Sequence, residues 1–245
     1  MLPETKDIYF LLLALLAEVL GTVGGFGSSL FFVPIATYFF DFHTALGITA
    51  VFHVLSNLTK ITLFREGVDR SIIIKIGVPA VVGVIIGAFA GKYIRTDILE
   101  LALALFLVAT SIVFLTFQKI NVEPSTQKSI WGGAFSGLIA GLIGTGGAVR
   151  GLVLAAFNLP TNVFIATSAF IDLGIDLSRS VVYALNGYVR VQDLFLMPYL
   201  LLISFAGTWI GKKILNKITN EEFKKLVLIL ILLTGIFTIY KSLTS

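Results

Sequence analysis

The chain has no cysteine and only two histidines, and these shortages remove several classes of chemistry. Without cysteine there is no disulfide, no thiolate nucleophile and no cysteine-ligated cluster. The sequence contains neither His-Glu-x-x-His nor Gly-x-Ser-x-Gly, and no glycine-rich stretch ends in Gly-Lys-Ser/Thr as a phosphate-binding loop does. We therefore expect neither enzyme activity nor a cofactor.

Charge is also scarce, which points to a lipid environment. Only 13% of the 245 residues are charged, 57% are hydrophobic, and the mean hydropathy is +0.97. Soluble domains average about 25% charged residues. Long uncharged stretches recur from Ile8 to Leu243, which predicts an all-α polytopic protein of the inner (plasma) membrane, with the lipid bilayer as its partner. The small net charge of +4 gives no reason to expect nucleic-acid binding.

A glycine-rich interruption occurs twice within the apolar stretches, 120 positions apart. Glycine is a poor helix former, and a helix broken inside hydrocarbon leaves backbone groups that must face protein or a wet cavity. Two breaks at matching positions therefore favour a substrate site. The candidate residues are Gly24, Gly25, Gly27 and Ser28 at the first break and Gly144, Thr145, Gly146 and Gly147 at the second.

A polar segment from Gln118 to Ser129 divides the chain into two similar halves, expected as repeats at 1–120 and 121–245. Each is predicted to contain a glycine-broken re-entrant hairpin and three transmembrane helices. The apolar arms of the hairpins hold about 11–14 residues, which is short for a span. The expected elements are a hairpin at about 8–40 with helices at about 44–64, 72–92 and 97–117, then a hairpin at about 129–158 with helices at about 161–184, 193–212 and 222–242.

Two further patterns bear on this repeat. Gly87-x-x-x-Gly91-Lys92 recurs 120 positions later as Gly207-x-x-x-Gly211-Lys212. If each hairpin turns back, the halves are inverted, and if each crosses the membrane, they are parallel. Lysine and arginine divide ten against five between the two membrane sides in the inverted arrangement and eight against seven in the parallel one, so the charge bias favours inverted repeats.

Ionisable residues inside apolar stretches usually face a cavity, and here they form two triplets with the same i, i+4, i+7 spacing. The triplets are His53, Asn57 and Lys60 in one half and Asp172, Asp176 and Arg179 in the other. The alternative to a functional role is a buried ion-pair cluster. In that cluster Asp176 pairs with Arg179, and Asp172 pairs with His53 or Lys60.

Arg150 follows the second glycine break, at the expected start of a short helix. A helix N-terminus presents free N–H groups and a partial positive charge, and an arginine fork added there suits an oxyanion. The alternative is that Arg150 reaches lipid headgroups. The hydroxyls of Thr49, Thr167 and Ser168 are further candidates for the site.

At these residues the chain resembles the TauE/SafE family of membrane transporters, also called sulfite exporters or toluene-sulfonate-uptake permeases. The resemblance covers nearly the whole chain. It rests on Gly24-Gly25-Phe26-Gly27-Ser28 followed by Pro34, on Gly144-Thr145-Gly146-Gly147, and on the two-half layout. The chain departs from the pattern where Phe26 interrupts the first glycine run, where Leu154 stands in place of a second proline, and in its added Arg150. The resemblance implies transport of sulfite, organosulfonates or related sulfur-containing anions.

The resulting hypothesis is a secondary transporter of a small sulfur-containing anion that works by alternating access. Ser28, Lys60 and Arg150, with the helix N-termini, are expected to bind the anion. The residues expected to couple transport to H⁺ or Na⁺ are His53, Asp172, Asp176 and Arg179. A passive anion channel and a membrane-embedded enzyme or scaffold are the alternatives.

Overall fold

The computed structural model describes residues 4–24, 27–65, 67–116, 124–215, 217, 229, 231–236 and 239. Over these residues the chain forms helices and connecting turns and contains no strand. The helices are α1 (Thr5–Gly24), α2 (Ser29–Phe39), α3 (Phe42–Leu63), α4 (Arg70–Ile72), the π-helical turn η1 (Ile73–Gly77), α5 (Val78–Gly91), α6 (Thr96–Thr116), α7 (Thr126–Ile143), α8 (Gly147–Ala155), α9 (Thr161–Leu185), the 3₁₀ turn η2 (Val191–Leu196) and α10 (Met197–Leu215).

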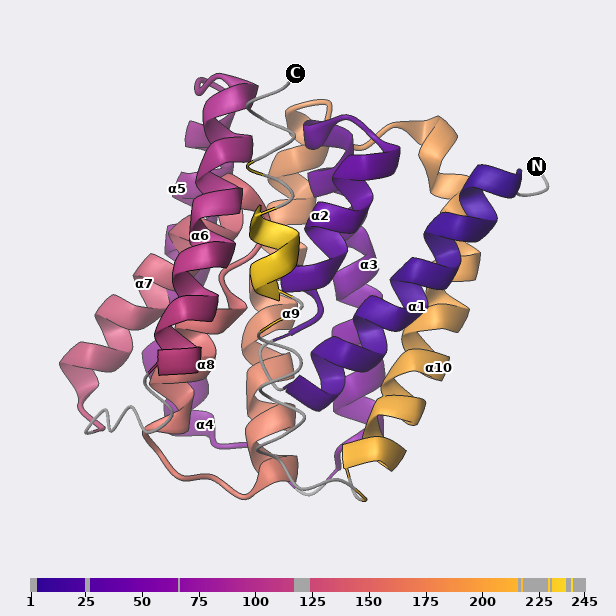
Figure 1. Cartoon of the computed structure of the whole chain (residues 1–245). Coiled ribbons are helices and arrows are strands. Elements are labelled where there is room, and N and C mark those ends of the chain that lie inside the picture. Colours follow the sequence, from indigo (N-terminus) through magenta and orange to yellow (C-terminus); the bar gives the residue numbers. More distant parts are fainter. Residues whose placement is uncertain are drawn as a thin grey trace.

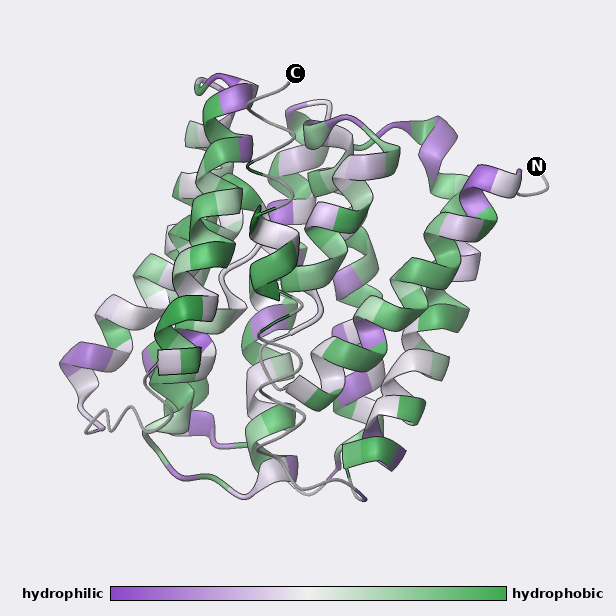
Figure 2. Ribbon diagram, in the orientation of Figure 1, coloured by the Kyte–Doolittle hydropathy of each residue, from purple (hydrophilic) through white to green (hydrophobic). Residues whose placement is uncertain are grey.

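Five of the described helical stretches are long and apolar enough to cross a membrane: α1, α3, Arg70–Gly91, α6 and Val191–Leu215. Their outward faces carry exposed apolar side chains such as Ile86, Leu105 and Leu202. Figure 2 shows hydrophobic colour along most of the helices and hydrophilic colour at the ends of the bundle. The chain is an all-α polytopic membrane protein. The last predicted helix, at about 222–242, lies largely outside the described residues.

The first glycine motif joins two antiparallel helices. A Cβ on Gly21 would lie 2.2 Å from the Cα of Ser28, so the end of α1 and the start of α2 touch. At the other end of the pair, the ring centroids of Phe10 and Phe40 are 5.1 Å apart. The helix α1 has 20 residues, more than the predicted arm, because it continues through Gly21 to Gly24. The length of α1 therefore gives no reason to expect that it is re-entrant.

The second glycine motif likewise joins antiparallel helices. A Cβ on Gly146 would lie 2.0 Å from the carbonyl oxygen of Ser136, which places the start of α8 against the last turns of α7. Farther along the pair, a Cβ on Gly132 of α7 would lie 2.4 Å from Cγ2 of Val153 in α8. The two motifs thus have the same local architecture.

Glycines also bring α10 against α1 and α5 against α7, and these contacts repeat at the predicted offset. The contacts pair Gly207 with Glu18 and Gly211 with Thr22 in one interface, and Gly87 with Leu138 and Gly91 with Leu142 in the other. Each residue of one interface therefore has its counterpart 120 positions away in the other interface. The internal repeat stays a prediction, and this packing favours it.

The helices α3 and α9, which carry the two triplets, pack against each other in the middle of the bundle. Figure 1 shows α9 and α3 between α5, α6 and α7 on one side and α1 and α10 on the other. Asp41 begins α3 by accepting a hydrogen bond of 3.0 Å from the backbone N–H of Thr44, and it also pairs with Arg190 at 2.5 Å. Partial burial acts to raise the pKa of Asp41, but these partners outweigh it and hold the pKa below its ordinary value.

Candidate functional site

The two glycine breaks open onto one small cavity between the triplet helices. Its volume, taken as the space open to the centres of water molecules, is about 40 Å³. By that measure one water needs about 10–15 Å³, so about three waters fit. The predicted site residues that line the cavity are Gly27, Ser28, His53, Asn57, Lys60, Gly144, Gly146, Gly147, Arg150, Ser168, Asp172, Asp176 and Arg179.

The second break gives α8 an open N-terminus at this cavity. Gly144 ends α7 with a φ of 80°, a left-handed conformation that glycine adopts without strain. Gly146 precedes α8, and no side chain caps the helix there. The first N–H groups of a helix have no partner within it, so the amides that follow Gly146 are free to bind a ligand.

The carbonyl groups left by the same break are satisfied from α9. The Arg179 guanidinium donates a hydrogen bond of 2.6 Å to the carbonyl of Gly144. The Tyr183 hydroxyl donates to the carbonyls of Gly141 at 2.8 Å and Ala140 at 3.2 Å. Sequence analysis missed Tyr183, although its position four residues after Arg179 places it on the same helix face. Together the two side chains pair carbonyls at Ala140, Gly141 and Gly144, where α7 ends inside the protein.

The first break is built around Ser28. Gly27 has a φ of 85°, and Ser28 then precedes α2 without capping it. The two breaks meet where the hydroxyls of Ser29 and Thr145 lie 3.0 Å apart. Gly24 is buried at the end of α1 but does not line the cavity, and Gly25 lies outside the described residues.

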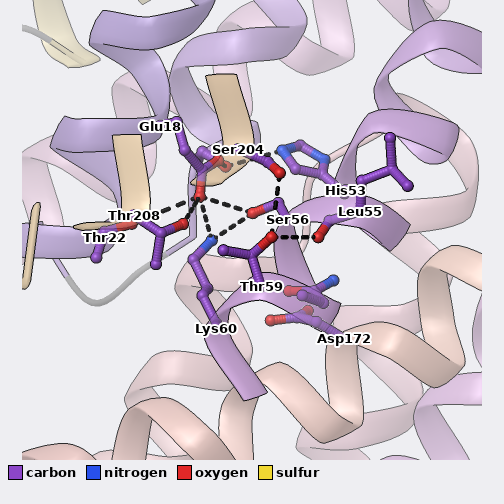
Figure 3. A network of polar contacts seen from close by, with 12 residues as sticks. Glu18, Thr22, His53, Leu55, Ser56, Thr59, Lys60, Asp172, Ser204 and Thr208 are labelled. Carbon is purple, nitrogen blue, oxygen red and sulfur yellow. Dashed lines mark hydrogen bonds and ion pairs between the residues drawn. The ribbon is translucent and has the colours of Figure 1, made fainter. Parts of the chain in front are cut away.

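Glu18 of α1 is the centre of a polar network that the sequence analysis did not identify (Figure 3). Its fully buried carboxylate pairs with the ammonium of Lys60 at 2.8 Å. It also accepts hydrogen bonds from three hydroxyls, those of Ser28 at the first break, Ser56 on α3 and Thr208 on α10, at 2.7, 2.7 and 3.0 Å. Lys60 thus lines the cavity with its charge already compensated. The sequence feature that could have revealed Glu18 is that it is the one acidic residue within the apolar Ile8–Gly21 run.

Two more ion pairs border the cavity. Asp176 pairs with Arg179 of its own helix at 2.7 Å and accepts a hydrogen bond of 2.6 Å from the amide of Asn57. The ion-pair interpretation was right for these two residues. It was wrong for Asp172, which pairs with Arg150 through both oxygens, at 2.5 and 2.6 Å, and not with His53 or Lys60.

The geometry around His53 defines its tautomer. Nδ1 lies 3.2 Å from the Arg179 guanidinium, which can only donate, so Nδ1 accepts and the ring proton is on Nε2. Nε2 then donates to the Ser28 hydroxyl at 2.9 Å, and Ser28 donates to Glu18. Arg179 therefore donates hydrogen bonds in two directions, to the second glycine break and, through His53 and Ser28, toward the first.

Three predicted hydroxyls do not line the cavity. That of Thr145 contacts the Ser29 hydroxyl instead. Thr49 donates to the carbonyl of Ala45 on its own helix at 2.6 Å, and Thr167 accepts from the backbone N–H of Asp69 at 3.0 Å. Both are fully buried, and neither lines the cavity. What remains around the cavity is three cations matched by three carboxylates, with a neutral histidine among them.

Comparison with known proteins identifies one family. Residues 10–238, nearly the whole chain, match the model of the family described as sulfite exporter TauE/SafE. No curated protein and no solved structure matches the chain.

Proposed function

Because the chain belongs to the TauE/SafE family of sulfite exporters, which are membrane transporters, we propose that it moves a small sulfur-containing oxyanion across the inner (plasma) membrane as a secondary transporter. The observation that carries the proposal is the meeting of two helix N-termini at one cavity beside Arg150. Amides at a helix N-terminus and an arginine fork are the groups that bind oxyanions in proteins.

Arg150 is proposed as the main anion ligand. Its guanidinium lies among residues of the cavity lining, and it already holds the two oxygens of a carboxylate, which supports binding of a group that offers paired oxygens. The amides at the start of α8 and the hydroxyl of Ser29 complete the proposed anion site. Lys60 is a weaker candidate than the sequence suggested, because Glu18 compensates its charge.

The size of the cavity favours a small substrate. A space for about three waters suits an anion such as sulfite or methanesulfonate and is too small for an aromatic sulfonate. Alternating access would expose this cavity to the two membrane sides in turn. Proton or Na⁺ coupling is proposed to involve the groups that border it, namely His53, Asp172, Asp176 and Arg179.

The test is conservative substitution of Arg150. Arg150→Lys keeps the charge that compensates Asp172 but loses the fork, so we expect the variant to fold and to bind sulfite at least about tenfold more weakly, as the loss of a charged hydrogen bond worth about 1.5–3 kcal/mol implies. Affinity is measured by thermal shift of the purified chain, and sulfite flux is measured in proteoliposomes. Arg95→Lys is the matched control, because Arg95 is an exposed residue whose ion pair with Asp97 lies away from the cavity.

Two outcomes would contradict this proposal. Arg150→Lys with unchanged sulfite affinity and flux would remove Arg150 from the anion site. A wild-type chain that neither binds nor moves sulfite, sulfate or methanesulfonate would end the oxyanion proposal. Flux that ignores imposed pH and Na⁺ gradients beyond their electrical effect would favour a passive channel.

A further inference from the structure

The three ion pairs around the cavity differ in how firmly they are held. Glu18 is fully buried and has three hydroxyl donors within 3.0 Å besides Lys60. Asp176 is also buried and is held by Asn57 as well as Arg179. Beyond Arg150, the one hydrogen-bond partner of Asp172 among the residues that the structure describes is Ser168, at 3.4 Å, and the Asp172 side chain is 19% exposed. The Arg150–Asp172 pair is therefore the one that requires the least free energy to separate.

The Arg150 guanidinium can donate one more hydrogen bond than it donates in this pair. Its side chain is only 3% exposed, and its Nε has no hydrogen-bond partner within the described part of the chain, although buried polar atoms normally have one. Asp172 occupies the two terminal nitrogens. A carboxylate has two oxygens to offer, whereas a sulfite or sulfonate group has three and can reach Nε as well.

On the basis of the proposed function, we infer that Asp172 is an internal competitor for the transported anion. Its carboxylate occupies the Arg150 guanidinium when no anion is bound, and a proton that binds to this carboxylate frees Arg150 for the anion. The exchange is balanced in charge: Asp172 loses one negative charge on taking up the proton, and the arriving monoanion restores it. One proton thus accompanies each monoanion, which selects H⁺ over Na⁺ as the coupling ion.

The charged surroundings of Asp172 limit which group takes the proton. From α8 it faces Arg150, and on its own helix Asp176 stands one turn away, already compensated by Arg179. From α3 the cavity is lined by His53 and by Lys60, which pairs with Glu18 of α1. His53 can take a proton only at Nδ1, where the Arg179 guanidinium already donates. Neutralising Asp172 releases the Arg150 guanidinium, which lines the cavity together with the first residue of α8.

The decisive experiment measures binding of methanesulfonate to the purified full chain between pH 5.5 and 8, because a sulfonate keeps its single charge over that range. We expect wild-type affinity to rise as the pH falls, by up to about tenfold per unit, the limit for one proton per anion. Asp172→Asn is expected to bind more tightly than wild type at pH 8 and to show no pH dependence. Asp97→Asn is the matched control, because this carboxylate forms an exposed ion pair with Arg95 away from the cavity, and the variant is expected to keep the wild-type pH dependence.

A second measurement needs no variant. In weakly buffered solution, wild type is expected to take up about one proton for each methanesulfonate bound, as the same linkage requires. Wild-type pH dependence that survives in Asp172→Asn, or binding without proton uptake, overturns the inference while leaving the transport proposal in place. Loss of pH dependence in His53→Gln but not in Asp172→Asn assigns the proton to His53 and also overturns it. Failure of wild type to bind any oxyanion overturns both proposals together.

Discussion

Replacing Glu18 with alanine is expected to lower the free energy of unfolding by about 3–5 kcal/mol, the usual cost of leaving one member of a buried ion pair without its partner. Among the described residues, the Lys60 ammonium would stay buried without an unpaired carboxylate beside it, because Asp172 and Asp176 are engaged by Arg150 and Arg179. The measurement is SDS-induced unfolding of the purified chain, together with its thermal midpoint in detergent.

The control for this prediction removes both charges of the Glu18–Lys60 ion pair. The variant Glu18→Leu with Lys60→Met places apolar side chains at both positions, and leucine is the residue found 120 positions later, at Leu138. Apolar replacement of a whole buried pair is often neutral, so we expect this double variant to recover most of the lost stability. The freed hydroxyls of Ser28 and Ser56 can donate to helix carbonyls. A single Glu18→Ala variant as stable as wild type would show that the ion pair does not form.

The Gly87→Ala substitution is expected to destabilise the protein by about 1–3 kcal/mol or more, because a Cβ there would lie 2.3 Å from the carbonyl oxygen of Leu138. The neighbour is backbone of α7, which cannot rotate away as a side chain can. Small residues at such positions are what allow membrane helices to approach closely. The readout is the same SDS unfolding measurement.

Gly91 of the same helix supplies the matched control. A Cβ at Gly91 would meet nothing closer than 3.8 Å, which is ordinary van der Waals contact. Alanine also favours helix over glycine, so Gly91→Ala is expected to be neutral or slightly stabilising. Equal effects of the two substitutions would contradict the close packing of α5 on α7.

Local pattern was sufficient to predict the features that depend on neighbouring residues in the sequence. The helical breaks follow from glycine clusters in apolar runs, and the cavity-facing triplets follow from the i, i+4, i+7 spacing of rare polar residues. Arg150 was predicted at a helix N-terminus because it directly follows a break, and α8 does begin there.

The features that were missed depend on partners far away in the sequence. The carboxylate of Glu18 is explained only by Lys60 and by the hydroxyls of Ser28, α3 and α10, which no local pattern connects. Thr49 failed as a site residue because a threonine inside a helix can bond its own backbone, and spacing does not distinguish that from a cavity-facing hydroxyl. The partner of Asp172 was predicted wrongly because the sequence contains several cations that could reach it, and the tertiary packing determines which one does.

The packing of helices from one predicted repeat against helices of the other constrains how the cavity can open. The first helix of each predicted repeat packs closely onto a helix of the other, α1 onto α10 and α7 onto α5, through contacts at Gly207, Gly211 and Gly87. The chain midpoint is therefore not a hinge line. We expect an opening motion to carry α1 together with α10 and α7 together with α5, so that each moving body contains helices of both predicted repeats and the Ser29–Thr145 contact connects the two bodies.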